Sequence, residues 1–126
     1  MPDTPSILVV EDEDMLREVV VEALEAAGWA THGSATGEDA VGLIDRLPRL
    51  DALLTDIRLP GAVDGWAVAE RFRARHERGA VIYATAFSAT HTPVSGSMFF
   101  RKPYKLQQIL LCLDALVPTR QRPPER

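Results

Sequence analysis

Acidic side chains follow two short apolar runs of the sequence, at the point where each run ends. Glu11 and Asp12 come directly after the run 6–10, and Asp56 ends the run 51–56. Two carboxylates about 4 Å apart repel by about 4 kcal/mol at an effective dielectric constant near 20, so a cluster of them requires a cation. Hard oxygen ligands at a wet, incomplete site favour Mg²⁺, which keeps several waters and leaves positions free for phosphate oxygens. These acids predict a Mg²⁺ site if the two runs are neighbours.

A hydroxyl group and an ammonium group stand at the ends of two later apolar runs. Thr85 ends the run 80–85, and Lys102 follows the run 98–101. Among the 14 basic residues only Lys102 and Lys105 are lysines, so the residue type at this position stands out. An ammonium group close to three carboxylates would complete their neutralisation.

The whole chain alternates short apolar, β-branched runs with segments of helical periodicity. Strands are predicted over 6–10, 29–34, 51–56, 80–85 and 98–101. Helices are predicted from Asp14 to a cap at Gly28, from Thr36 or Gly37 to Leu47, from a cap at Asp64 to Gly79, and over 106–116. The segment 88–97 is rich in Ser, Thr, Gly and Pro, which predicts a loop. Strands alternating with helices indicate an α/β fold with a parallel sheet, in which ligands bind beyond the carboxyl ends of the strands.

Length and composition indicate one domain. The chain has 126 residues, 46% hydrophobic and 25% charged, with a net charge of −4. We expect residues 1–118 to form the domain and 119–126 to form a polar tail. The acidic balance disfavours nucleic acid as a partner, and no apolar run approaches the roughly 18 residues of a membrane span. The first residues of the chain lack a signal-peptide pattern, and the single Cys112 can form no internal disulfide, so we expect a cytoplasmic protein. We interpret Cys112 as a small buried thiol.

A series of short motifs resembles the receiver domain of two-component response regulators, over nearly the whole chain. The motifs are Ile7-Leu-Val-Val-Glu-Asp12, Leu54-Thr-Asp-Ile-Arg-Leu-Pro-Gly61, the Asp64-Gly65 pair after it, Tyr83-Ala-Thr-Ala86 and Phe100-Arg-Lys-Pro103. Any one of them is weak evidence, whereas the full set in this order is strong. The resemblance implies a flavodoxin-like, doubly wound sheet of five parallel strands in the order 2-1-3-4-5.

The resemblance also implies how the clustered acids act. Asp56 would accept a phosphoryl group from a histidine kinase or from a histidine phosphotransfer protein. Mg²⁺ would be held by Glu11, Asp12 and Asp56, together with the backbone carbonyl of Arg58. Phosphoryl transfer requires mostly positioning and charge neutralisation from the protein, apart from the nucleophile itself.

Three further residues complete the implied site. The Lys102 ammonium would offset charge on the oxygens of the transferring group, and the Thr85 hydroxyl would donate a hydrogen bond to the product phosphate. By the resemblance, Thr85 moves toward the aspartyl phosphate and Phe99 turns inward behind it, so that these two residues form a switch. The Lys102-Pro103 bond resembles a family bond that is often cis.

Two segments depart from the family pattern. The segment between Thr85 and Lys102 is a few residues short, and 88–97 cannot form an amphipathic helix, so we expect the fourth helix to be short or replaced by a loop. With Tyr83-Ala-Thr85, this resembles a subgroup of single-domain receivers that have a Phe/Tyr-Ala-Thr motif and are often associated with histidine kinases of the HWE type. The segment 60–65 is one residue longer than the common version, which should reshape the loop beside Asp56 without moving Asp56.

Three functions remain open from the sequence, and the intact site residues favour the first. This is a stand-alone receiver in a phosphorelay, which signals by protein contact and is at most a slow autophosphatase. The second is an interaction module that kept the fold and works without phosphorylation. The third is a Mg²⁺-dependent phosphohydrolase with Asp12 as the nucleophile, because Asp12-Glu13-Asp14 superficially matches the aspartate-x-aspartate motif of haloacid dehalogenase-like enzymes.

Overall fold

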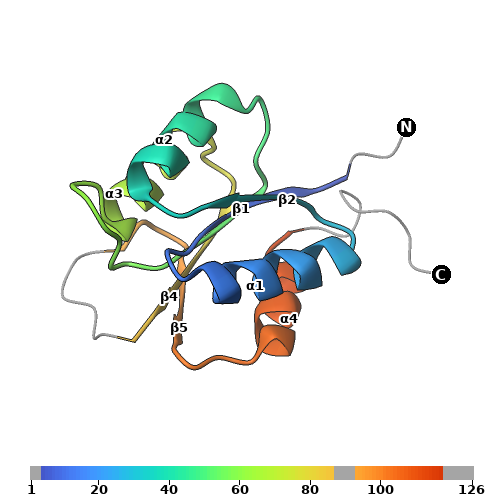
Figure 1. Ribbon diagram of the computed structural model, residues 1–126. Coiled ribbons are helices and arrows are strands. Elements are labelled where there is room, and N and C mark those ends of the chain that lie inside the picture. Colours follow the sequence, from blue (N-terminus) through green and yellow to red (C-terminus); the bar gives the residue numbers. More distant parts are fainter. Residues whose placement is uncertain (1–3, 87–92, 118–126) are drawn as a thin grey trace.

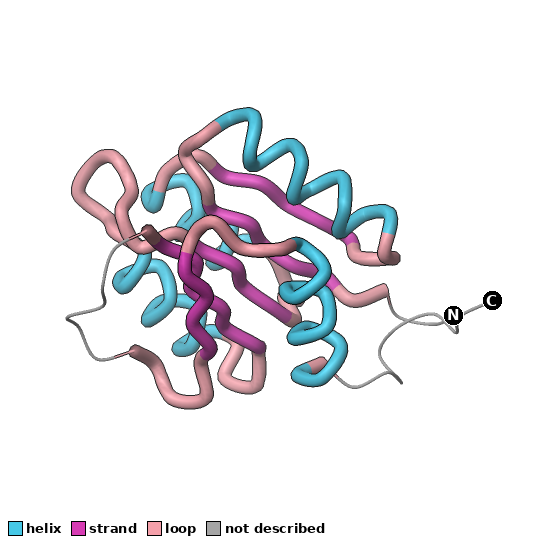
Figure 2. The backbone as a smooth tube through the Cα atoms, turned by 90° about the horizontal axis from the view of Figure 1, so that it is seen from below, coloured by secondary structure: helices cyan, strands magenta, loops and turns pink. Residues whose placement is uncertain are grey.

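The fold is a parallel sheet of five strands with helices on both faces (Figures 1 and 2). The computed structural model describes residues 4–86 and 93–117. The strands are β1 (Ser6–Val10), β2 (Ala30–Ser34), β3 (Ala52–Thr55), β4 (Ala80–Thr85) and β5 (Met98–Arg101), and the helices are α1 (Asp14–Ala26), α2 (Gly37–Arg46), α3 (Gly65–Arg75) and α4 (Leu106–Leu116). The strand order is β2-β1-β3-β4-β5, which confirms the predicted flavodoxin-like, doubly wound topology.

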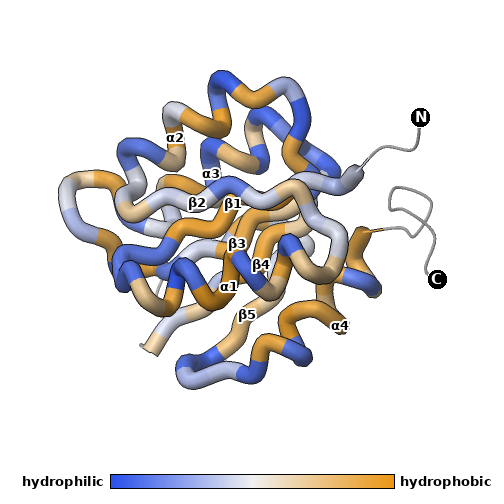
Figure 3. The backbone as a smooth tube through the Cα atoms, turned by 45° about the vertical axis from the view of Figure 1, so that its right-hand side comes forward, coloured by the Kyte–Doolittle hydropathy of each residue, from blue (hydrophilic) through white to orange (hydrophobic). Residues whose placement is uncertain are grey.

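Two apolar layers hold the helices against the sheet. Alternate side chains of β1 point to opposite faces, so that Ile7 and Val9 pack with α1 and α4, while Leu8 and Val10 pack with α2 and α3. All five residues of β1 are buried, as expected for a strand covered on both sides. Figure 3 shows the hydrophobic residues concentrated in the central strands.

Local sequence signals set several of the helix ends. The Thr36 side chain accepts a hydrogen bond from the Asp39 N–H at the start of α2, and the Asp64 side chain caps α3 by accepting from the Ala67 N–H. Gly28 follows α1 with a φ of 100°, in the left-handed region that favours glycine. These caps agree with the sequence-based prediction, although α3 ends at Arg75 rather than at Gly79.

The register of the sheet brings the ends of β1 and β3 together. Val10 is paired with Thr55, so Glu11 and Asp56 each follow directly after a paired position. The backbone continues the ladder there, because the Asp56 N–H donates to the Val10 carbonyl at 3.0 Å. On the other side of β3, Thr85 at the end of β4 is paired with Arg101 of β5. The carboxyl edge of the sheet therefore carries all the residues that the sequence singled out for chemistry.

Between β4 and β5 the described residues form no helix. Ala86 and residues 93–97 are bends, turns or irregular backbone, which agrees with the predicted replacement of the fourth helix by a loop. Residues 88–92 of that predicted loop lie outside the described residues, as do 119–126 of the predicted tail. Cys112, predicted to be a buried thiol, is only half-buried on α4. No helix among residues 4–86 and 93–117 has both the length and the apolar character to cross a membrane.

Candidate functional site

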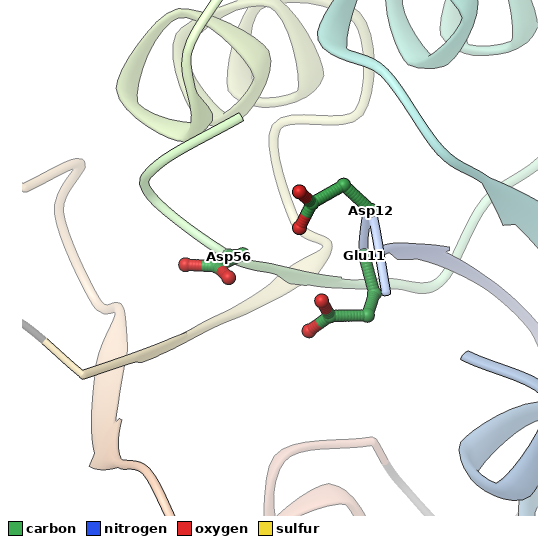
Figure 4. Close-up of side chains that lie close together, drawn as sticks. All are labelled: Glu11, Asp12 and Asp56. Atoms are coloured by element: carbon green, nitrogen blue, oxygen red, sulfur yellow. The ribbon is translucent and has the colours of Figure 1, made fainter. Parts of the chain in front are cut away.

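Three carboxylates gather where β1 and β3 end (Figure 4). Glu11, Asp12 and Asp56 each offer one oxygen atom, and these atoms all lie within 4.8 Å of one another. Glu11 is 5% exposed and Asp56 9% exposed, whereas Asp12 is open to solvent. Oxygen ligands of this kind, with one exposed member, fit a hard divalent cation that keeps part of its water shell. The cluster predicted from the sequence is confirmed as a group that could hold a metal ion.

Lys102 lies between two of these acids. Its Nζ donates to Glu11 Oε1 at 2.7 Å and to Asp56 Oδ2 at 2.9 Å. Partial burial alone would lower the pKa of Lys102, but the hydrogen bonds and charges of the two carboxylates outweigh it and raise the pKa. The side chain therefore carries its positive charge between Glu11 and Asp56.

Glu11 is held at both of its carboxylate oxygens. Oε1 accepts from Lys102, and Oε2 accepts from the Glu13 N–H at 3.0 Å. Burial raises the pKa of Glu11, and the hydrogen bonds from Lys102 and Glu13 limit that rise. Asp56 uses Oδ2 for Lys102, and Oδ1 accepts a long hydrogen bond of 3.3 Å from the Arg58 N–H. Asp12 is thus the exposed acid of the cluster, and Glu11 is its most firmly positioned member.

Thr85 and Lys102 are joined through their backbones. Thr85 is 1% exposed at the end of β4, and its carbonyl accepts from the Lys102 N–H at 2.9 Å. The following Lys102-Pro103 bond is cis, as the resemblance implied. The structure places Thr85 at the same edge as the acids, on the strand next to β3.

Phe99 lies in an aromatic group on the other side of the site. Its ring centroid is 5.1 Å from that of Tyr83 and 5.9 Å from that of Trp66, and the Trp66 and Tyr83 rings are 4.8 Å apart. Phe99 is nevertheless 39% exposed, and its strand β5 lies at the edge of the sheet. The Tyr83 hydroxyl accepts from the Val94 N–H at 3.2 Å, which fixes the chain before β5 to the same group.

The loop after Asp56 is wedged between two helix starts. A Cβ atom built on Gly65 would stand 2.0 Å from the Asp56 carbonyl oxygen, and one on Gly37 would stand 2.2 Å from the Val63 carbonyl oxygen. The Glu38 carboxylate accepts from the Ala62 N–H at 2.9 Å. These contacts depend on tertiary placement that no local pattern in the sequence signals.

Arg17 is a further residue that sequence reasoning missed. Its guanidinium group donates to the Glu11 carbonyl at 2.7 Å and to the Asp14 carboxylate at 2.9 Å. The i, i+3 spacing of Asp14 and Arg17 on a helix is a signal for their ion pair. Nothing in the sequence indicates the contact with the carbonyl of Glu11.

Comparison with known proteins identifies the family. The family model described as "Response regulator receiver domain" matches residues 7–113, and the chain belongs to this family. Receiver domains of two-component systems act with histidine kinases or phosphotransfer proteins as a class. The membership confirms the resemblance drawn from the sequence motifs, whereas the Phe/Tyr-Ala-Thr subgroup stays a prediction.

Curated relatives contain the matching region as part of a longer chain. The regulatory protein AtoC of Escherichia coli is 31% identical over 113 residues, which are 86% of this chain and 24% of that protein. The sensor kinase CckA of Brucella abortus is 28% identical over 110 residues, or 82% of this chain and 12% of that protein. The matching region also covers 49% of the regulator TcrX of Mycobacterium tuberculosis. The chain therefore spans about half or less of the length of these curated relatives.

Solved structures share the whole fold. A response regulator receiver protein from Sinorhizobium medicae superposes with a TM-score of 0.86 at 25% identity, covering 93% of this chain and 97% of that one. The response regulator TrrA of Thermotoga maritima, solved in complex with Mg²⁺-BeF, gives a TM-score of 0.77 at 26% identity and covers 90% of this chain and 99% of that one.

Proposed function

We propose that this receiver domain accepts a phosphoryl group on the Asp56 carboxylate. The observation that carries the proposal is the Lys102 ammonium group, which contacts Glu11 and Asp56 while Asp12 stays open to solvent. An anionic phosphoryl group that approaches Asp56 meets a fixed positive charge there, and an exposed acid leaves room for a divalent ion and its waters.

The proposed reaction is a substitution at phosphorus. A carboxylate oxygen of Asp56 forms the new O–P bond while the bond from phosphorus to the donor breaks, and the donor group leaves with the bonding electron pair. A phosphohistidine donor leaves as imidazole, which takes a proton, and acetyl phosphate leaves as acetate. Lys102 keeps its proton throughout and offsets the charge on the phosphoryl oxygens.

The metal in this proposal is Mg²⁺, bound by Glu11, Asp12, Asp56 and the backbone carbonyl of Arg58. The all-oxygen donor set supports the assignment, as does the solved complex of the similar receiver TrrA with Mg²⁺-BeF. Bound Mg²⁺ would neutralise charge on the phosphoryl oxygens and orient them toward Asp56. The buried Glu11 would hold its carboxylate in a fixed position toward the ion, because Lys102 and the Glu13 N–H each donate to one of its oxygens.

Thr85 and Phe99 form the proposed switch. The Thr85 hydroxyl donates to a phosphoryl oxygen on Asp56, and Phe99 moves with it. The exposure of Phe99 supports this assignment, because a ring that is 39% exposed has apolar surface still to bury. Its contacts with Tyr83 and Trp66 connect the switch to the chain before β5.

The proposed phosphodonor is a histidine kinase, of the HWE type if the subgroup prediction is correct, or a histidine phosphotransfer protein. An apolar hollow of about 560 Å³ adjoins Lys102 and gives a protein donor a surface beside Asp56; Leu16, Val19, Pro103 and Tyr104 are among its lining residues. We further propose that residues 1–118 form the domain. We place it in the cytoplasm, where such donors transfer phosphoryl groups, and we propose that it signals by protein contact.

The test is phosphorylation by acetyl phosphate with Mg²⁺, followed by the mass of the intact protein. The wild type is expected to gain one phosphoryl group, and the gain should require Mg²⁺ and disappear in Asp56→Asn. Glu25→Gln, an exposed acid in the last turn of α1, is the matched control and should be phosphorylated like the wild type.

Two results would contradict the proposal. A wild-type protein that gains no phosphoryl group under these conditions would favour the phosphorylation-independent interaction module. A gain that persists in Asp56→Asn and is lost in Asp12→Asn would favour the phosphohydrolase.

A further inference from the structure

Arg17 reaches back from α1 over the turn that carries two of the clustered acids. Its backbone N–H donates to the Glu13 carbonyl at 2.9 Å, and its guanidinium group donates to the Glu11 carbonyl at 2.7 Å. The second amino group of the guanidinium pairs with Asp14 at 2.9 Å. One side chain thus connects the start and the end of the short segment between β1 and α1.

The stem of Arg17 is also fixed. The side chain is only 23% exposed, and its stem lies over Gly33 of β2. A Cβ atom built on Gly33 would be in van der Waals contact with Arg17 Cδ, at 3.5 Å. The guanidinium group is therefore directed along the end of the sheet rather than into solvent. A planar group with several donors in a fixed arrangement loses little freedom when it holds two acceptors at once.

Glu11 is held by four different contacts as a result. Its N–H donates to the Ser34 carbonyl, its carbonyl accepts from Arg17, and its carboxylate accepts from Lys102 and from the Glu13 N–H. Of these four, only the contact with Arg17 fixes the carbonyl of the peptide unit that joins Glu11 to Asp12. The orientation of that peptide unit determines where the Asp12 side chain points.

We propose that Arg17 is a positioning residue for the metal-binding acids. It fixes the peptide between Glu11 and Asp12, so that the exposed Asp12 carboxylate faces Asp56 before any ion binds. The inference rests on the proposed function, because it concerns the Mg²⁺ affinity of that same site. The guanidinium group of Arg17 donates to the Glu11 carbonyl and to the Asp14 carboxylate, and neither acceptor is a carboxylate oxygen of Glu11, Asp12 or Asp56.

Positioning and simple charge predict opposite effects of removing Arg17. The guanidinium group is a cation close to a cation site, so its charge alone weakens metal binding, and its removal would strengthen binding. If Arg17 instead orients the ligands, its removal weakens metal binding. Loss of a residue that positions metal ligands commonly lowers the metal affinity by about tenfold or more. The sign of the change separates the two explanations.

The experiment measures Mg²⁺ affinity by NMR titration of the ¹⁵N-labelled protein. Arg17→Met keeps most of the stem and removes both donors, and it should raise the Kd for Mg²⁺ about tenfold. Arg17→Lys keeps the charge but cannot donate to both acceptors in the same way. Its Kd for Mg²⁺ should lie between that of the wild type and that of Arg17→Met. Arg46→Met, an exposed arginine in the last turn of α2, removes the same charge elsewhere and should leave the Kd unchanged.

A second readout separates positioning from a general loss of stability. In phosphorylation by acetyl phosphate, Arg17→Met should need more Mg²⁺ for half of the maximal rate, while the rate at saturating Mg²⁺ stays close to that of the wild type. If Arg17→Met does not fold, Arg17→Lys provides the same comparison with a smaller shift.

The outcomes are distinguishable. A wild type that binds Mg²⁺ together with an Arg17→Met variant whose Kd is unchanged or lower would overturn this inference alone. The same holds if Arg17→Met loses only unfolding free energy and keeps its Mg²⁺ affinity. A wild type that binds no Mg²⁺ would overturn the proposed function and this inference with it.

Discussion

Lys102 Nζ lies 2.9 Å from Asp56 Oδ2, although these residues follow strands that are not neighbours. Lys102 follows β5 and Asp56 follows β3, with β4 between them. The long lysine side chain passes the end of β4 to reach the acids, and it also contacts Glu11 at 2.7 Å. A long, flexible side chain with a compact charge suits these two contacts.

Replacing Lys102 with methionine should destabilise the metal-free protein. The change leaves Glu11 and Asp56 mostly buried without their cation, which we expect to lower the unfolding free energy by roughly 1–3 kcal/mol. Mg²⁺ should restore part of the loss, because it supplies positive charge to the same acids. Urea denaturation in EDTA and in Mg²⁺ measures both effects.

Lys105→Met is the matched control, since Lys105 is the other lysine and is exposed at the start of α4. It should unfold like the wild type in both buffers. An equal loss of stability in the two lysine variants would show that the contacts of Lys102 with the acids contribute nothing specific.

Replacing Gly65 with alanine should disrupt the site through the backbone. The added Cβ would stand 2.0 Å from the Asp56 carbonyl oxygen and 2.6 Å from Ile57 Cα, so β3 and α3 would have to separate. We expect a loss of about 1–3 kcal/mol in unfolding free energy together with slower phosphorylation. Thermal denaturation and the rate of acetyl phosphate labelling measure the two effects.

Gly42→Ala provides the comparison within a helix. Its Cβ would meet only Arg46 Nη1, the far end of a flexible side chain, at 3.4 Å. Alanine inside a helix is favoured over glycine by up to about 1 kcal/mol, so this variant should be as stable as the wild type or more stable. A Gly65→Ala protein with unchanged stability and labelling rate would refute the close approach of α3 to Asp56.

The contact between Glu38 and the loop after Asp56 should depend on pH. Hydrogen bonds from the backbone, the strongest from Ala62, hold the pKa of Glu38 below its ordinary value of 4.5. A carboxyl group with a lowered pKa in the folded state stabilises the fold above its unfolded pKa, and this contribution is lost as the pH falls through the folded pKa. The stability advantage of the wild type over Glu38→Gln should therefore be constant above pH 4.5 and shrink below it.

Urea denaturation between neutral and acidic pH measures this difference, with Glu25→Gln as the baseline for an exposed acid on α1. An advantage of the wild type over Glu38→Gln that grows as the pH falls would contradict the sign of this prediction. A difference that does not change with pH would show that the Glu38 carboxylate does not hold the loop in solution.

Phe99 should report on the proposed switch through Trp66. The two rings are 5.9 Å apart, so movement of Phe99 would change the surroundings of the tryptophan. We expect the fluorescence of Trp66 to change when Mg²⁺ and beryllofluoride are added to a Trp29→Phe protein, in which Trp66 is the remaining tryptophan. The change should be absent in Phe99→Leu, although Asp56 is still phosphorylated at a normal rate. An identical fluorescence change in Phe99→Leu would remove Phe99 from the switch.

Much of the fold was predictable because its signals are local. Largely apolar runs mark the buried strands β1, β3 and β4, and caps such as Asp64 and Gly28 mark helix ends. Parallel strands place their carboxyl ends at one edge, so the acids after β1 and β3 were expected to meet. The convergence of Glu11, Asp12 and Asp56 confirms that expectation.

Contacts between distant side chains were not predictable in the same way. Arg71 of α3 forms two hydrogen bonds with Asp45 of α2, and Arg73 donates to the carbonyls of Gly79 and Ser95. These partners come from other elements, and their positions follow only from the assembled fold. The contacts of Arg17 and Glu38 near the site belong to the same class.

The exposure of single residues was also beyond the sequence. An aromatic residue in a short strand is usually buried, yet Phe99 is partly exposed because β5 is the last strand of the sheet. Cys112 is half-buried although cysteine is among the residues most often found inside proteins. In both cases the neighbouring elements, and not the residue type, determine how much of the side chain meets solvent.

The most direct test of the account is to locate the phosphorylated residue chemically. Borohydride reduces an aspartyl phosphate to homoserine, and peptide mass spectrometry then finds the altered position. After treatment with acetyl phosphate and Mg²⁺, we expect homoserine at position 56 and aspartate at position 12. Homoserine at position 12, or a phosphorylated protein with no homoserine at position 56, would contradict the assignment of Asp56 as the phosphoacceptor.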